Sequence, residues 1–119
     1  MTYQHRELAS GRWNALSLVE QLGNVGSEVE RALKWKAKNN PEYCMRAFER
    51  ALELLDLTLA CPAHRHRLRE IARTREILVD FFHGENQFST TGKSLSDYFL
   101  QFACAARRAM TSTELPARP

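Results

Sequence analysis

The chain has 119 residues, of which 44% are hydrophobic and 26% are charged, with 5 glycines, 4 prolines and a formal net charge of +3. This length suits one domain with its own core, and the composition excludes a fully disordered, collagen-like or low-complexity protein. A net charge this small does not identify a class of partner by itself.

Two further features bear on where the protein resides. No apolar run approaches the roughly 18 residues of a membrane-spanning helix, and the first residues lack the apolar segment of a signal peptide. The cysteines are Cys44, Cys61 and Cys104, an odd and widely spaced set that does not suggest a disulfide framework. We therefore expect a cytoplasmic protein that does not enter a membrane.

Helical periodicity runs through most of the chain and predicts an all-α fold. The predicted helices span about 14–38, 41–60, 63–83 and 94–110. In the first, apolar residues recur every three or four positions from Leu18 to Leu33, whereas Gly23 and Gly26 either weaken the helix or permit a close helix crossing. In the second, Asn40 suits the N-cap and Pro41 the first helical position.

The later helices carry weaker boundary signals. Pro62 suits the start of the third, Gly84 its end, and Ser94 the N-cap of the fourth. Four amphipathic helices with short connections favour an antiparallel up-and-down four-helix bundle. We expect an N-terminal arm over 1–13, one helical-bundle domain over 14–110 and a disordered tail over 111–119.

Charge is distributed unevenly along the chain. Residues 62–75 contain five arginines and one glutamate, a net charge of +4, whereas 76–97 carry a net charge of −3. Within the basic segment Arg65, Arg69 and Arg73 recur every four residues, so one helical face would present a ladder that suits RNA phosphates. Alternatively, carboxylates on neighbouring helices pair with these arginines, and the ladder is simply a solvated surface.

Cys61, His64 and His66 are the best candidate metal ligands, since three residue types that bind zinc fall within six positions. No second ligand pair lies nearby in the sequence. The alternative is a connection with exposed histidines and Cys61 packed against the end of the bundle. Asp80 and His83 match half of a di-metal helix pattern. Solvated helix faces are the simpler explanation, and we expect no cofactor.

No catalytic residues are predicted, because the chain lacks a nucleophile elbow and both glycine-rich phosphate-binding patterns. The favoured hypothesis is a non-enzymatic interaction module that forms a homodimer and holds a protein partner. Trp13, Trp35 and Phe88 would supply its interaction surface. The alternatives are an RNA-binding helper that uses Arg65 and its two neighbours, and a metal-binding bundle.

Residues 18–107 resemble a family of small prokaryotic helical-bundle proteins with no assigned activity. The resemblance is carried by 35–36, 47–56, 80–86, 98–99 and 102–103. The predicted helical architecture is also similar to HEPN bundles and to the helical substrate-binding partners of minimal nucleotidyltransferases. HEPN ribonucleases have an arginine followed after four to six residues by a histidine, but seven residues separate Arg75 from His83. The resemblance therefore implies a bundle fold and a non-catalytic helper.

Overall fold

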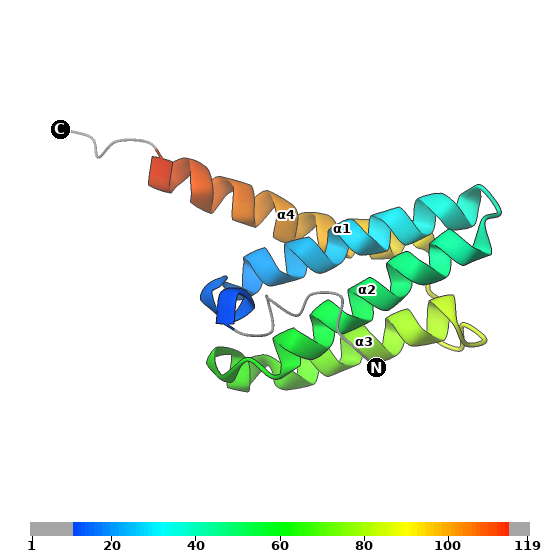
Figure 1. Ribbon diagram of the computed structural model, residues 1–119, viewed down its shortest axis with the longest axis horizontal. Helices are drawn as coiled ribbons and strands as arrows, with labels where there is room; N and C mark the ends of the chain where they lie inside the picture. The colour runs from blue at the N-terminus through cyan, green and yellow to red at the C-terminus, as the bar shows by residue number, and fades with distance from the viewer. Residues whose placement is uncertain (1–10, 115–119) are drawn as a thin grey trace.

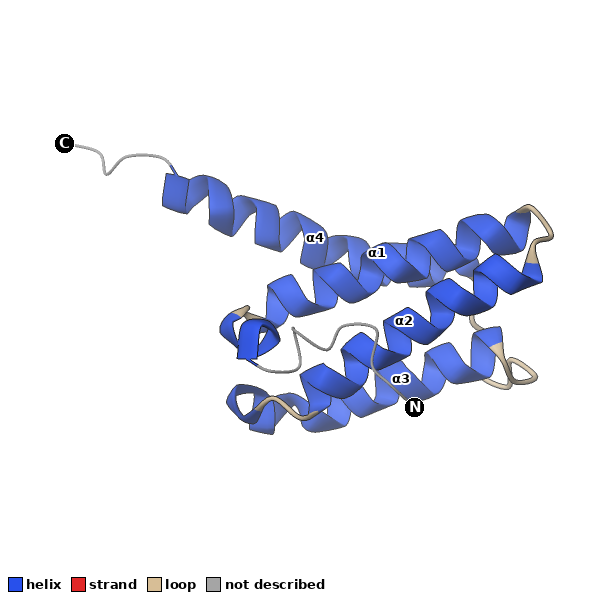
Figure 2. Cartoon of the chain, viewed as in Figure 1, coloured by secondary structure: helices blue, strands red, loops and turns tan. Residues whose placement is uncertain are grey.

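The computed structural model describes the backbone of residues 11–114 and the side chains of residues 11–109. Its elements are the short 3₁₀ turn η2 (Trp13–Ala15), α1 (Leu18–Ala37), α2 (Pro41–Leu59), the 3₁₀ segment η3 (Pro62–Arg67), α3 (Leu68–Phe82) and α4 (Gly92–Glu114). Over this part of the chain there are helices and connections but no strands (Figure 2). The predicted all-α, four-helix fold is confirmed.

The first helix, α1, packs against both α2 and α4, and α3 lies along the other side of α2. Figure 1 shows α4 crossing behind α1. The main core fills the spaces between these pairs. Its largest fully buried aliphatic side chains are Leu22, Val25, Val29, Leu55, Ile71 and Leu78. Burial of such side chains is the main source of stability in a fold of this kind.

Local caps fix the starts of α1 and α2. The Ser17 hydroxyl accepts the backbone N–H of Glu20, and the Glu20 carboxylate accepts the backbone N–H of Ser17, which makes a complete capping box. The Asn40 side chain accepts the backbone N–H of Tyr43, directly before Pro41 at the first helical position. The predicted cap of the second helix is therefore confirmed.

Of the two roles open to the glycines of α1, the close helix crossing is the one observed. A Cβ atom placed on Gly26 would lie 2.7 Å from the Cβ atom of Phe99, so only glycine lets α4 approach α1 at this point. At Gly23 the nearest atom is the Cα atom of Ala103, 3.7 Å away, which is an ordinary contact. The crossing therefore depends on one of the two glycines.

Several predicted boundaries are wrong by a few residues. The first helix begins at Leu18 rather than at 14, because the Ser17 cap fixes its first turn. The third begins as the 3₁₀ segment η3, because the backbone of His64 departs from helical angles. Thr91, not Ser94, caps α4: the Thr91 hydroxyl accepts the backbone N–H of Ser94, and the Ser94 hydroxyl accepts that of Thr91.

The predicted terminal segments are only partly covered by the structure. Trp13, placed in the arm, belongs to the bundle because its side chain is 2% exposed. Residues 111–114, placed in a disordered tail, continue α4. The remainder of both predicted segments, 1–10 and 115–119, lies outside the described residues. Between 11 and 114, no helix combines the length and apolar character needed to cross a membrane.

Candidate nucleic-acid interface

Five arginines lie on η3 and α3, and they fall into two groups. Arg67, the last residue of η3, forms an ion pair with Glu70 in the first turn of α3 at 2.6 Å, and Arg75 forms one with Asp56 on α2 at 2.8 Å. The second group is Arg65, Arg69 and Arg73, whose side chains are exposed and form no ion pair with any carboxylate of residues 11–109. The expected ion pair with a neighbouring helix thus occurs at Arg75, and not at Arg65, Arg69 or Arg73 within residues 11–109.

The three unpaired arginines do not form one regular ladder. Arg69 and Arg73 are one turn apart on α3, so they occupy the same helical face. Arg65 lies in η3, and both His64 and Arg67 have backbone angles outside the α-helical range. The predicted ladder is therefore correct for Arg69 and Arg73, which share one face of α3. Arg65 lies outside that face, in the preceding 3₁₀ segment.

The loop between α3 and α4 is held by its own hydrogen bonds. The carboxylate of Asp80 accepts the backbone N–H groups of Gln87 at 2.7 Å and Phe88 at 3.0 Å. Asn86 and Thr90 are joined by two reciprocal side-chain to backbone bonds of 2.8 Å. This loop is therefore an ordered structure that presents Phe88 at a defined position.

Phe88 brings an exposed aromatic ring to the basic face. The guanidinium carbon of Arg73 lies 5.0 Å from the centre of its ring, within the range of a cation–π contact. Phe88 nevertheless remains 45% exposed, so part of its ring is open to solvent. This contact is not evident from the sequence, because Phe88 follows Arg73 by fifteen positions and only the loop brings them together.

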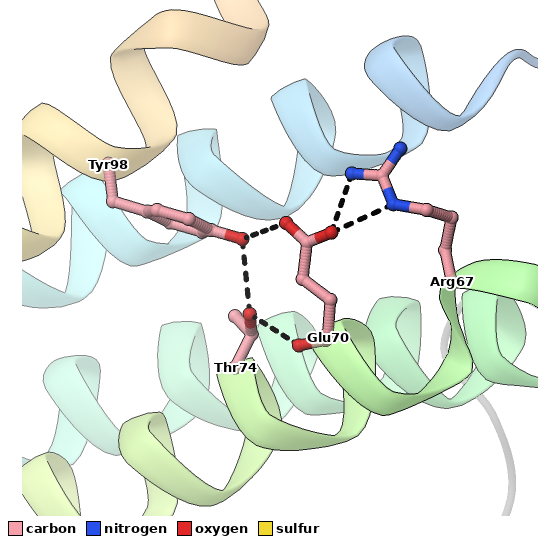
Figure 3. Close-up of polar contacts among 4 residues, drawn as sticks. All are labelled: Arg67, Glu70, Thr74 and Tyr98. Carbon is pink, nitrogen blue, oxygen red and sulfur yellow. Dashed lines mark hydrogen bonds and ion pairs between the residues drawn. The ribbon is translucent and has the colours of Figure 1, made fainter.

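A polar cluster joins α3 to α4 beside this face (Figure 3). The Tyr98 hydroxyl donates to a carboxylate oxygen of Glu70 at 3.2 Å and lies 3.2 Å from the Thr74 hydroxyl. The other carboxylate oxygen of Glu70 accepts two bonds from the Arg67 guanidinium at 2.6 and 2.8 Å. Burial raises the pKa of Tyr98 above its ordinary value, so its hydroxyl remains protonated at neutral pH.

The three predicted metal ligands, Cys61, His64 and His66, lie in different environments. His64 is buried and its Nε2 atom lies 3.0 Å from the Oε1 atom of Gln21, whereas His66 is exposed. The Cys61 thiol is buried and accepts a long contact of 3.9 Å from the Gln21 amide. Between residues 11 and 109, no three His, Cys, Asp or Glu side chains are grouped so that they could hold a metal ion.

Gln21 instead organises a buried network at this end of the bundle. Its amide nitrogen donates to the backbone carbonyl of Trp13 at 2.8 Å, so its oxygen is left to accept from His64. The Trp13 indole donates to the Thr58 hydroxyl at 3.1 Å. Burial lowers the pKa of His64 below 6.5, and the positive charges of His66 and Arg67 lower it further.

The three residues of the predicted interaction surface differ in burial and do not form one exposed surface. Trp13 is buried in the core, so its place in that surface was wrong: its ring fills the space beside α2 and its N–H bonds to Thr58. Trp35 is partly buried and packs edge-on against Tyr43, with ring centres 4.8 Å apart, which closes the turn between α1 and α2. Of the three aromatic residues, Phe88 alone is exposed.

A hollow of about 610 Å³ lies between α2 and α3. Its polar lining includes Glu49, Glu53 and Asp56, together with Arg75, which is paired with Asp56. Carboxylates that outnumber cations in this way would repel a phosphate backbone. The basic face for a nucleic acid is therefore the face with Arg69 and Arg73, not this hollow.

Comparison with family models, with curated proteins and with solved structures found no match in any of the three. The resemblance to small helical-bundle proteins and to HEPN bundles accordingly stays a prediction.

Proposed function

We propose that the protein binds single-stranded RNA, with Arg65, Arg69 and Arg73 contacting phosphates and Phe88 stacking on a base. The observation that carries this proposal is the contact between Arg73 and the exposed ring of Phe88. Nonspecific single-strand binders combine cationic side chains with aromatic rings in this way.

The charges on the face support this role. Each arginine that contacts a phosphate releases counterions, which is the main source of affinity in such complexes. An arginine already paired with a carboxylate contributes less, because the pair must be broken first. Arg65, Arg69 and Arg73 form no such pair among the described residues.

Phe88 supports single strands over duplexes. A base in a duplex is stacked on its neighbours, whereas a base in a single strand is free to stack on an aromatic side chain. Because the Asp80 carboxylate and the Asn86–Thr90 bonds hold the loop, little conformational entropy is lost when the ring is covered.

The role is one of binding rather than catalysis, since the sequence contains none of the catalytic motifs considered above. The favoured sequence-based hypothesis, a protein-interaction module, has less support than RNA binding because Trp13 is buried and Trp35 closes a turn. Self-association as a homodimer and cytoplasmic residence remain predictions from the sequence.

The test compares two triple variants in a fluorescence-anisotropy titration with a labelled single-stranded RNA. Arg65, Arg69 and Arg73 are changed to Ala in the first variant, and Lys34, Lys36 and Lys38 in the second. Both lose three positive charges from exposed positions. We expect the arginine variant to bind about tenfold more weakly or worse at low salt, and the lysine variant to bind nearly as the wild type does. Equal loss in both variants would overturn the proposal.

A further inference from the structure

A small cavity of about 200 Å³ lies between α3, α4 and the loop that joins them. Its lining residues are Thr74, Ile77, Thr90, Ser94, Leu95 and Tyr98. The cavity lies beside the loop of the proposed RNA-binding face, since Thr90 of its lining is two positions after Phe88 in that loop. A strand held at Phe88 would therefore pass close to its opening.

Three hydroxyl groups of the lining have already donated their single hydrogen to the protein. Thr74 donates to the backbone carbonyl of Glu70 at 3.0 Å, and Ser94 donates to the carbonyl of Thr91 at 2.8 Å. Tyr98 donates to the Glu70 carboxylate (Figure 3). A hydroxyl has one hydrogen and two lone pairs, so these groups can only accept hydrogen bonds from a ligand.

Charge strengthens this preference for a donor. The Tyr98 hydroxyl donates to one oxygen of the negatively charged Glu70 carboxylate. The other oxygen of that carboxylate accepts both bonds from Arg67. A hydrogen bond in a chain of this kind polarises the next one, which makes the Tyr98 oxygen a better acceptor. No partner among the described residues fixes the hydroxyl hydrogen of Thr90, so Thr90 can donate to an acceptor atom of the ligand.

The remaining walls suit a flat ring. Ile77 and Leu95 supply aliphatic surface, and Tyr98 supplies an aromatic face. We propose that this cavity receives one unpaired nucleobase whose exocyclic amino group donates to Thr74 and Tyr98, and whose adjacent ring nitrogen accepts from Thr90. Cytosine and adenine have this arrangement, as guanine does at its N2–N3 edge, whereas uracil has no exocyclic amino group and places a carbonyl there. The inference rests on the proposed function and names the bases that the same face prefers.

The experiment measures binding of labelled oligo(C), oligo(A) and oligo(U) RNAs of about eight nucleotides, a length typical of one single-strand site. A pair of specific base contacts discriminates by about 1–3 kcal/mol, so we expect oligo(C), oligo(A) or both to bind about tenfold more tightly than oligo(U). Comparison of oligo(C) with oligo(A) shows whether the cavity prefers cytosine or adenine. Equal affinity for all three RNAs would overturn the inference and leave the proposed function intact.

Two variants connect the preference to the cavity. Tyr98→Phe removes an acceptor oxygen, and Thr74→Val removes another with almost no change of shape. We expect each to lower the preference over oligo(U) while the affinity for oligo(U) itself is kept. Tyr43→Phe is the matched control, because Tyr43 is exposed on α2 beside Trp35. A preference that survives in both cavity variants would overturn the inference, whereas no binding of any RNA at low salt would overturn the proposed function.

Discussion

The Asp80 carboxylate accepts the backbone N–H of Phe88 at 3.0 Å, across eight positions of sequence. A side chain near the end of α3 thereby fixes the loop residue whose ring lies against Arg73 on the same helix. The position of the proposed stacking residue thus depends on an acidic residue that itself has no role in binding phosphates.

Removing that carboxylate should weaken RNA binding without unfolding the bundle. In Asp80→Ala the loop loses both side-chain bonds to Gln87 and Phe88, which we expect to cost about 1 kcal/mol of unfolding free energy. The affinity for single-stranded RNA should fall by several-fold, because Phe88 is no longer held in place. Anisotropy titrations and urea unfolding measure the two effects. Glu76→Ala, an exposed acidic residue on α3, is the control and should bind RNA at least as well as the wild type. Unchanged affinity in Asp80→Ala would count against the role of the loop.

Phe88 should matter for binding and not for stability. Because its ring is 45% exposed, Phe88→Ala should leave the unfolding free energy nearly unchanged. Loss of one stacked base costs about 1–3 kcal/mol, or roughly 5- to 150-fold in affinity. Phe88→Trp keeps a stacking face and should bind at least as tightly as the wild type. If Phe88→Ala binds normally, no base stacks on this ring.

The buried His64 should make stability depend on pH. Its pKa is lowered from 6.5 in the folded state, so between the two values the unfolded chain binds more protons than the folded one. This contribution is complete above pH 6.5 and is lost as the pH falls below that value. Urea unfolding at about pH 7.5 and pH 5.5 should show a decrease that His64→Gln reduces and that His83→Gln, at the exposed end of α3, does not. Equal pH dependence in all three proteins would contradict the assignment to His64.

The two glycines of α1 should respond oppositely to alanine. In Gly26→Ala the new Cβ atom would lie 2.7 Å from that of Phe99, and pushing α4 away should cost about 1–3 kcal/mol. In Gly23→Ala the nearest atom is 3.7 Å away, so higher helix propensity should stabilise the protein by up to about 1 kcal/mol. Thermal unfolding of the pair checks the sign of each change. A melting temperature raised by both substitutions would contradict the close crossing.

Much of the fold was predictable because its signals are local. The Asn40 cap, the proline after it and the apolar period of each helix all lie within a few residues of the structure they specify. The helix starts that were predicted wrongly also depend on local signals, because more than one nearby residue is able to act as the cap. Thr91 and Ser94 are both able to cap, and only the hydrogen bonds of the folded turn show that Thr91 does so.

The candidate site was only partly predictable because its contacts are distant in sequence. Arg69 and Arg73 were visible as a helical repeat, but their lack of carboxylate partners among the described residues depends on how α3 packs on α2. The contact of Arg73 with Phe88 depends on a loop conformation, and that of Tyr98 with Glu70 spans 28 positions. Trp13 was misplaced for the same reason: its partner Thr58 is 45 positions away.

The salt dependence of RNA binding reports how many phosphates Arg65, Arg69 and Arg73 contact. If three arginines each contact one phosphate of a single strand, a plot of the logarithm of affinity against the logarithm of salt concentration should have a slope of about −2. With Arg65, Arg69 and Arg73 changed to Ala, the slope should approach zero. A flat plot for the wild type, or the same slope for both proteins, would contradict RNA binding through this face.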